Sequence, residues 1–120
     1  MDAGALIAFD RNNRRVRRLV ELAIEHEGAL HVPAGVVAQA WGDASRQARL
    51  ARLVGSGRLS IRNLDVTEAK AAGVLCAASG TADVIDASVV LLARRHGAVV
   101  VTSDPDDLRR FDPTLEVAAC

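Results

Sequence analysis

The chain has 120 residues, a length that suits one domain with a single hydrophobic core, so we expect residues 1–120 to fold as one domain. Only two Phe and one Trp are aromatic, which argues against a platform of stacked rings for single-stranded nucleic acid. The net charge is zero, so overall electrostatic attraction does not single out a nucleic acid as the partner.

Several other function classes find no support in the sequence. No apolar run approaches the ~18 residues that a membrane-spanning helix requires. Cys76 and Cys120 lack the spacing of metal ligands, and without a signal-peptide pattern they are expected to be reduced, as in a cytoplasmic protein. There is no phosphate-binding glycine loop and no dinucleotide-binding fingerprint, and the three His residues are scattered.

Helical and strand patterns alternate along the chain. Segment 12–27 has one apolar helical face and is followed by Gly28, a typical helix stop. Asp65, with Glu68 three residues later, has the pattern of a capping box. Such alternation predicts a doubly wound α/β fold, with a parallel sheet of about four to five short strands flanked by helices. In chain order we predict a helix at 12–27, a strand at 29–32, helices at 34–41 and 44–54, a strand at 58–64, helices at 65–78 and 83–95, a strand at 98–101, a helix at 105–111 and a strand at 115–118.

Carboxylates stand at the predicted junctions between strands and helices. Asp104 follows the apolar strand at 98–101, and Asp2 precedes another apolar stretch. Asp83 and Asp86 begin a helix three residues apart, which places them on one face. Because parallel α/β sheets bind ligands outside the carboxyl ends of their strands, these four side chains are expected to share one crevice. Carboxylate oxygens are suitable ligands for a hard divalent cation.

Most of these carboxylates also have a purely structural interpretation. Asp104, followed by Pro105, has the pattern of a helix N-cap with Pro at the first helical position. Asp83 would be favoured by the dipole of the helix that it begins. Asp86 is harder to explain, because it lies in an apolar stretch, where an unpaired buried carboxylate costs about 2–7 kcal/mol or more. Asp2 alone permits no interpretation.

Fourteen of the fifteen basic residues are Arg, and five of them cluster near the start of the chain. Guanidinium groups match phosphate oxygens well, so this cluster could contact an RNA backbone. The alternative is a solvated helix face without a ligand. The cluster consists of Arg11, Arg14, Arg15, Arg17 and Arg18, and Arg94 with Arg95 form a second candidate.

Four segments, at 2–8, 32–41, 86–87 and 101–104, follow one another in the order and spacing of a known family. The sequence resembles PIN-domain ribonucleases and, among them, the VapC toxins of bacterial toxin–antitoxin pairs. The resemblance implies a parallel sheet with acidic residues that hold Mg²⁺ or Mn²⁺. It also implies hydrolysis of RNA, a homodimer, and inhibition by a small antitoxin protein.

Carried over by position, Asp2, Asp86 and Asp104 match the acidic residues of that family, which implies catalytic and metal-binding roles. Asp83, on the helical face of Asp86, is an additional candidate ligand. Thr102 matches a hydroxyl residue that usually precedes the last acid by two positions.

The sequence departs from the family pattern at two points. Gln39 stands where Glu is common, and a neutral amide binds a cation less well and cannot act as a base. The family usually has a short apolar strand ahead of its first Asp, and here only Met1 precedes Asp2, so the first strand is expected to be truncated. Asp83 could partly replace the missing charge.

Three hypotheses follow from these observations. The first is a metal-dependent endoribonuclease of the PIN/VapC type. The second is a PIN-fold interaction domain that binds an antitoxin or RNA without cleavage, for which Gln39 and the short start argue. The third is an aspartyl-phosphate hydrolase with Asp2 as nucleophile, although Gly4 stands where such enzymes carry a second carboxylate. Metal-dependent cleavage of mixed RNA separates the first two, and a trapped phosphoenzyme would support the third.

Overall fold

The computed structural model describes every residue from Met1 to Cys120. Helices alternate with short parallel strands, so the predicted α/β class is confirmed. In chain order the elements are α1 (Ala3–Asp10), α2 (Arg14–Glu27), β1 (Leu30–Pro33), α3 (Ala34–Ala40), the 3-10 turn η1 (Ala44–Arg46), α4 (Ala48–Gly55), β2 (Leu59–Arg62), α5 (Val66–Ser79), α6 (Val84–His96), β3 (Val100–Thr102), α7 (Pro105–Arg109) and β4 (Val117–Ala119).

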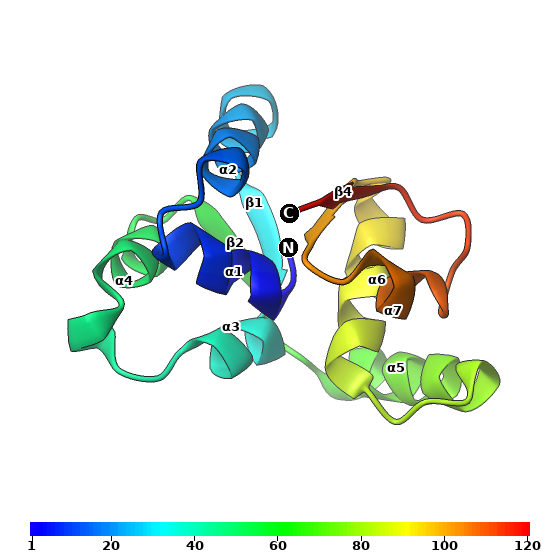
Figure 1. Ribbon diagram of the computed structural model, residues 1–120. Helices are drawn as coiled ribbons and strands as arrows, with labels where there is room; N and C mark the ends of the chain where they lie inside the picture. Colours follow the sequence, from blue (N-terminus) through cyan, green and yellow to red (C-terminus); the bar gives the residue numbers. More distant parts are fainter.

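The four strands form two parallel pairs, whereas the sequence predicted one sheet. Strand β1 pairs with β2, and β3 pairs with β4. Figure 1 shows the two pairs on either side of the chain's first residues, with both termini between them. The N–H of Asp2 donates to the carbonyl of Val101 at 3.1 Å, so the start of the chain touches the edge of β3 without forming a strand.

A hydrophobic slot of about 330 Å³ separates the two strand pairs. Its walls include Leu30 and His31 of β1 and Val100 and Val101 of β3, and Met1 lies at its border. The amino group of Met1 is buried, and this burial lowers its pKa to about 6. The slot is therefore an apolar gap between two strand edges that no further strand covers.

Helix boundaries follow local capping chemistry. The side chains of Asn13, Asp65 and Asp83 each accept a hydrogen bond from the N–H three residues later, as N-cap residues do. Gly28 and Gly97 end α2 and α6 in the left-handed conformation, which glycine adopts without steric cost. These bounds differ from the predicted ones by at most two residues.

Two predicted elements differ more strongly from the observed ones. The helix expected at 44–54 is broken at Gln47, whose side chain bonds to the Gly42 N–H and the Ala40 carbonyl and thereby separates η1 from α4. The strand expected at 58–64 is limited to β2, where only Leu59 is buried and Ile61 is exposed.

Helix α1 lies at the centre of the hydrophobic core. Ala5 and Leu6 are fully buried, and α1 contacts α2, α3, α4 and β3. Helix α5, in contrast, packs mainly on α6, and Val66 and Val74 on its outer surface are 71 % exposed. No single helix is long and apolar enough to cross a bilayer. Helices α5 and α6 meet these two criteria only when taken together, and the pair is bent by 107°.

Candidate acidic site

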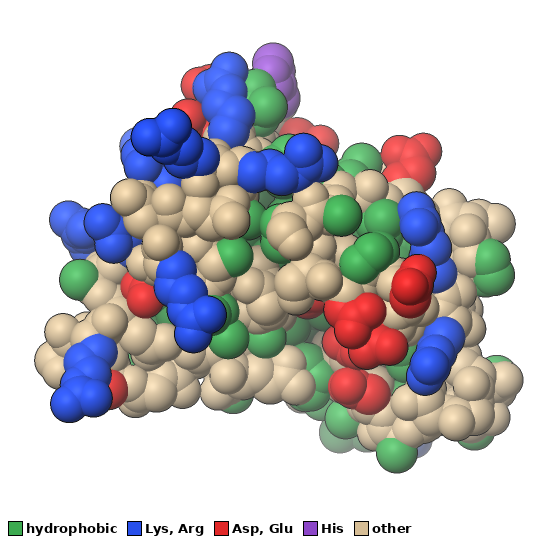
Figure 2. Space-filling view, viewed as in Figure 1, with side chains coloured by type: hydrophobic (Ala, Val, Ile, Leu, Met, Phe, Trp, Pro, Cys, Tyr) green, Lys and Arg blue, Asp and Glu red, His purple; other side chains and the backbone are tan.

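The N-termini of three helices, α1, α6 and α7, each carry an Asp as the capping residue. Asp2 accepts from the N–H of Ala5 at 2.9 Å, Asp83 from Asp86 at 3.0 Å, and Asp104 from Asp107 at 3.4 Å. Figure 2 shows red side chains gathered in one patch on the part of the surface where Figure 1 places α6 and α7. Local capping therefore explains the orientation of these carboxylates, and the fold brings their helices to one face.

Thr102 links Asp2 to the segment that carries Asp104. Its hydroxyl donates to Oδ2 of Asp2, and its Oγ1 accepts the backbone N–H of Asp104 at 2.9 Å. Thr102 is completely buried, and Asp2 is only 8 % exposed. Because both oxygens of Asp2 accept hydrogen bonds, its side chain is fixed in one orientation.

Asp86 is half-buried in the first turn of α6, and its electrostatic surroundings are unusual. Its pKa is raised to about 6, first by burial and then by the neighbouring carboxylates of Asp83, Asp2 and Asp107, in that order. None of the five ion pairs of the structure involves these four residues. Asp86 thus lies among carboxylates that form no ion pair with Arg or Lys, which is a typical property of a functional site.

Gly4 allows α1 to approach the segment that carries Asp104. A Cβ atom at Gly4 would lie 1.8 Å from Oγ and 2.8 Å from Cβ of Ser103, distances that no real contact reaches. Ser103 is the residue between Thr102 and Asp104. The absence of a side chain at Gly4 therefore lets α1, which begins after Asp2, pack directly against the segment that carries Asp104.

Gly4→Ala is expected to destabilise the fold by about 1–3 kcal/mol and to displace the segment around Asp104, because the overpacked Ser103 has to move. Gly73→Ala is the matched control, since Gly73 lies inside α5 with open space around it. There the added methyl group should stabilise by about 0.5–1 kcal/mol. Urea unfolding of the two variants measures both effects. Equal stabilities would show that α1 and the Ser103 segment are not in close contact.

The carboxylates suit a hydrated divalent cation better than an ion enclosed by protein ligands. No three His, Cys, Asp or Glu side chains are placed to ligate one ion. The donor set is nevertheless of the right type, because Mg²⁺ retains several waters and needs only one or two carboxylates. The uncompensated charge around Asp86 gives a cation a favourable position.

Gln39 and the arginines proposed from the sequence take no part in the hydrogen bonds that hold the Asp residues of the site. Gln39 is exposed near the end of α3. Arg11 and Arg14 are exposed where α1 ends and α2 begins. Arg15 donates from Nε to the carbonyl of Ala119 at 2.7 Å, so it holds α2 against the end of β4.

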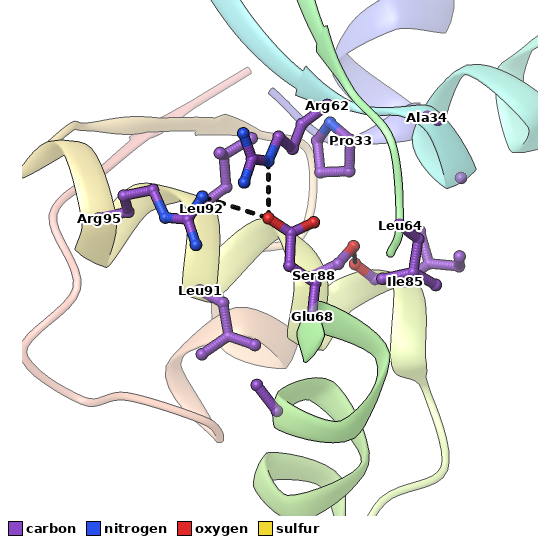
Figure 3. A pocket seen from close by; sticks show the side chains of 12 residues that line it. Pro33, Ala34, Arg62, Leu64, Glu68, Ile85, Ser88, Leu91, Leu92 and Arg95 are labelled. Carbon is purple, nitrogen blue, oxygen red and sulfur yellow. Dashed lines mark hydrogen bonds and ion pairs between the residues drawn. The ribbon is translucent and has the colours of Figure 1, made fainter. Parts of the chain in front are cut away.

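A concavity that the sequence did not indicate is lined by residues of α5 and α6, and none of the site's Asp residues lines it. Figure 3 shows this pocket of about 220 Å³ between α5, α6 and the end of β2, with Glu68 between Arg62 and Arg95. Glu68 accepts from Arg62 at 2.6 Å and from Arg95 at 3.2 Å. The capping box predicted at Asp65 is therefore only half formed: Asp65 caps the Glu68 N–H, but the Glu68 side chain pairs with arginines.

Comparison with protein families gives a match over most of the chain. Residues 1–112 match the family described as PIN domain, which covers the acidic side chains and all elements except β4. No curated protein matches the chain.

Proposed function

The chain belongs to the PIN domain family, whose members are generally nucleases, and from this premise we propose that it is a metal-dependent endoribonuclease of the VapC type. The observation that carries the proposal is Asp86, half-buried among carboxylates without a basic partner. Such a group is costly in a protein that does not use it.

The proposed chemistry is hydrolysis of a phosphodiester bond in RNA. Asp2, Asp86 and Asp104, with Asp83 nearby, would hold Mg²⁺ or Mn²⁺, which supplies Lewis acidity toward water and positive charge beside the phosphate. Thr102 and the Ala5 N–H keep Asp2 in one orientation. Asp104 is held through its backbone N–H, which donates to Thr102, and through its side chain, which accepts from the Asp107 N–H. Pre-organisation of this kind reduces the rearrangement needed when substrate binds.

The partners in this proposal rest on the resemblance to VapC toxins. We propose an RNA substrate, a small antitoxin protein that inhibits cleavage, and a homodimer in the cytoplasm. Size-exclusion chromatography with light scattering tests the homodimer. Co-purification with a protein encoded beside the gene tests the antitoxin.

The decisive experiment is incubation of the purified chain with mixed cellular RNA in Mg²⁺, in Mn²⁺ and in EDTA. The proposal expects cleavage with either metal and none in EDTA. An interaction domain without catalysis is the alternative, and the exposed neutral Gln39 together with the absence of a three-ligand cluster favours it. Binding of RNA without cleavage in any metal would support that alternative.

Gln39→Glu is expected to tighten Mn²⁺ binding several-fold if Gln39 occupies the position of the family's Glu, because another carboxylate would add attraction and a ligand. Isothermal titration with MnCl₂ measures the affinity. Asn63→Glu is a suitable control, since it introduces the same charge in place of another exposed amide, just after β2. An unchanged affinity in Gln39→Glu would show that this side chain does not reach the cation.

A further inference from the structure

A hollow lined by arginines lies away from the acidic site, between α2, α4 and the residues that lead into β2. It encloses about 540 Å³. Its floor is apolar, with side chains of Phe9, Val20, Ile24 and Leu53. Arg17 of α2, Arg49 and Arg52 of α4, and Arg58 ahead of β2 line it with Glu21 and Ser56.

The positive charge of this hollow is not neutralised within the protein. None of its four guanidinium groups takes part in an ion pair, and its one carboxylate, Glu21, pairs with Arg18 at 3.4 Å. Arg17 and Arg49 donate only to neutral oxygens, those of Asn12 and of the Asp10 backbone. The side chains of Arg52 and Arg58 form no hydrogen bond.

Three separate elements bring these arginines together, so the cluster is not the solvated face of one helix. Like charges on converging elements repel one another, and an anion in the hollow would relieve this repulsion. Guanidinium groups bind phosphate oxygens through paired N–H donors. An apolar floor between charged walls suits a ligand whose phosphates alternate with less polar groups, as in a nucleic acid strand.

Helix α1 connects the hollow to the acidic site. Asp2 caps its first turn, and Phe9 near its other end lines the hollow. Seven residues separate the two positions, about 10 Å at 1.5 Å per residue. Figure 2 shows blue side chains over the region where Figure 1 places α2 and α4, and the red patch lies on the same face beyond α1.

We propose that the Arg17–Arg49–Arg52–Arg58 hollow binds the phosphate backbone of single-stranded RNA and directs the strand along α1 to the carboxylates. The inference rests on the proposed nuclease function, because it names where the substrate is held. The hollow replaces Arg11, Arg14 and Arg15 as the principal RNA contact. Arg15 in particular is bonded to the Ala119 carbonyl.

The test is fluorescence anisotropy with a fluorescein-labelled 12-nucleotide single-stranded RNA in EDTA, which prevents metal-dependent cleavage. Arg52→Ala/Arg58→Ala removes two side chains that bond to nothing in the protein, so the fold should be unaffected, as circular dichroism will verify. We expect at least tenfold weaker binding at 50 mM NaCl. The slope of log K against log salt should fall by about 1.4, since each phosphate contact in a single strand contributes ≈ 0.7.

Arg46→Ala/Lys70→Ala is the matched control, because it removes the same charge from two exposed positions outside the hollow. The control should bind RNA within about twofold of the parent. An unchanged affinity and slope in Arg52→Ala/Arg58→Ala would overturn the proposal, and so would an equal loss in the control. Poly-glutamate is added as a competitor that represents an acidic polypeptide. If it displaces the RNA at an equal concentration of negative charge, the proposal is also overturned.

The same data separate this inference from the nuclease proposal. If the parent binds RNA through the hollow but cleaves none in Mg²⁺ or Mn²⁺, the nuclease proposal fails and the binding site stands. If the parent cleaves RNA, and the variant Arg52→Ala/Arg58→Ala binds and cleaves RNA as well as the parent does, the proposed binding site is wrong and the nuclease proposal stands.

Discussion

Asp86→Asn is expected to abolish metal-stimulated RNA cleavage, by about two orders of magnitude or more, while the protein remains folded. The reason is the position of Asp86 among Asp83, Asp2 and Asp107, where its charge attracts a cation and repels its neighbours. Asn has the same shape without the charge. Cleavage of a fluorescent RNA in Mg²⁺ and Mn²⁺ measures the effect on activity.

The stability of the metal-free protein provides a second measurement. Because the pKa of Asp86 is raised to about 6, the charged form is disfavoured in the folded state, and its destabilising effect grows as pH rises from 4 to above 6. Asp86→Asn removes this effect. In EDTA its melting temperature should therefore equal or exceed that of the parent, with the larger gain at pH 7.5 than at pH 5.

Asp104→Asn should cause the same loss of cleavage with little change in stability, since Asn caps a helix as well as Asp does. Asp65→Asn is its control, because it alters the cap of α5, far from the acidic site in the chain, and should leave cleavage intact. If Asp86→Asn and Asp104→Asn both cleave RNA like the parent, the proposed site is wrong.

Those parts of the fold that depend on neighbours within four residues could be predicted from the sequence. The apolar face of α2, the cap at Asp65 and the stop at Gly28 rest on contacts of three or four residues, and the structure forms them. The same applies to Asp83 and Asp104, whose capping bonds reach three residues ahead. The alternation of these local elements was sufficient for the α/β class.

Contacts between distant residues could not be predicted from periodicity. The bond from Thr102 to Asp2 spans 100 residues, and only the family resemblance singled out Thr102. Glu68 has the spacing of a capping box, but Arg62 and Arg95 together attract its carboxylate more strongly than a backbone N–H. The arginine hollow combines α2, α4 and the approach to β2, and nothing local connects them.

The division of the strands into two pairs has a similar cause. The sequence predicts which segments are extended, but pairing depends on what lies between the strands. No strand lies between β1 and β3, and the N–H of Asp2 donates to the carbonyl of Val101 there. The hydrophobic slot between the two strand pairs is therefore a feature of tertiary packing that the periodicity of the sequence does not indicate.

Extension of the chain by four Val and Ile residues ahead of Met1 is expected to raise stability by several kcal/mol. Such residues would enter the slot between β1 and β3, where both facing strand edges are open and the walls are apolar. A central parallel strand is buried on both faces and bonded on both edges. Each buried polar group left unpaired costs roughly 1–3 kcal/mol, against a domain stability of about 5–15 kcal/mol.

Thermal melts of the parent, the apolar extension and a Ser/Asn extension of equal length measure this effect. The apolar extension should melt roughly 10 °C or more above the other two, at about 4 °C per kcal/mol for a domain of this size. Equal melting temperatures for the two extensions would contradict the prediction. They would mean that the slot does not accept a strand and that the open edges of β1 and β3 are stable without one.

The pH dependence of stability distinguishes a filled slot from a nonspecific gain. In the parent, burial lowers the pKa of the Met1 amino group to about 6 from a usual value of 8.0. The unfolded chain therefore binds the proton more readily, and this group reduces stability as pH falls from 8 to 6, by up to about 2–3 kcal/mol. In the apolar extension the Met1 nitrogen becomes an amide that can bond within the sheet. The stability of this variant should therefore no longer depend on pH between 6 and 8, because the buried amino group of Met1 has become a neutral backbone amide.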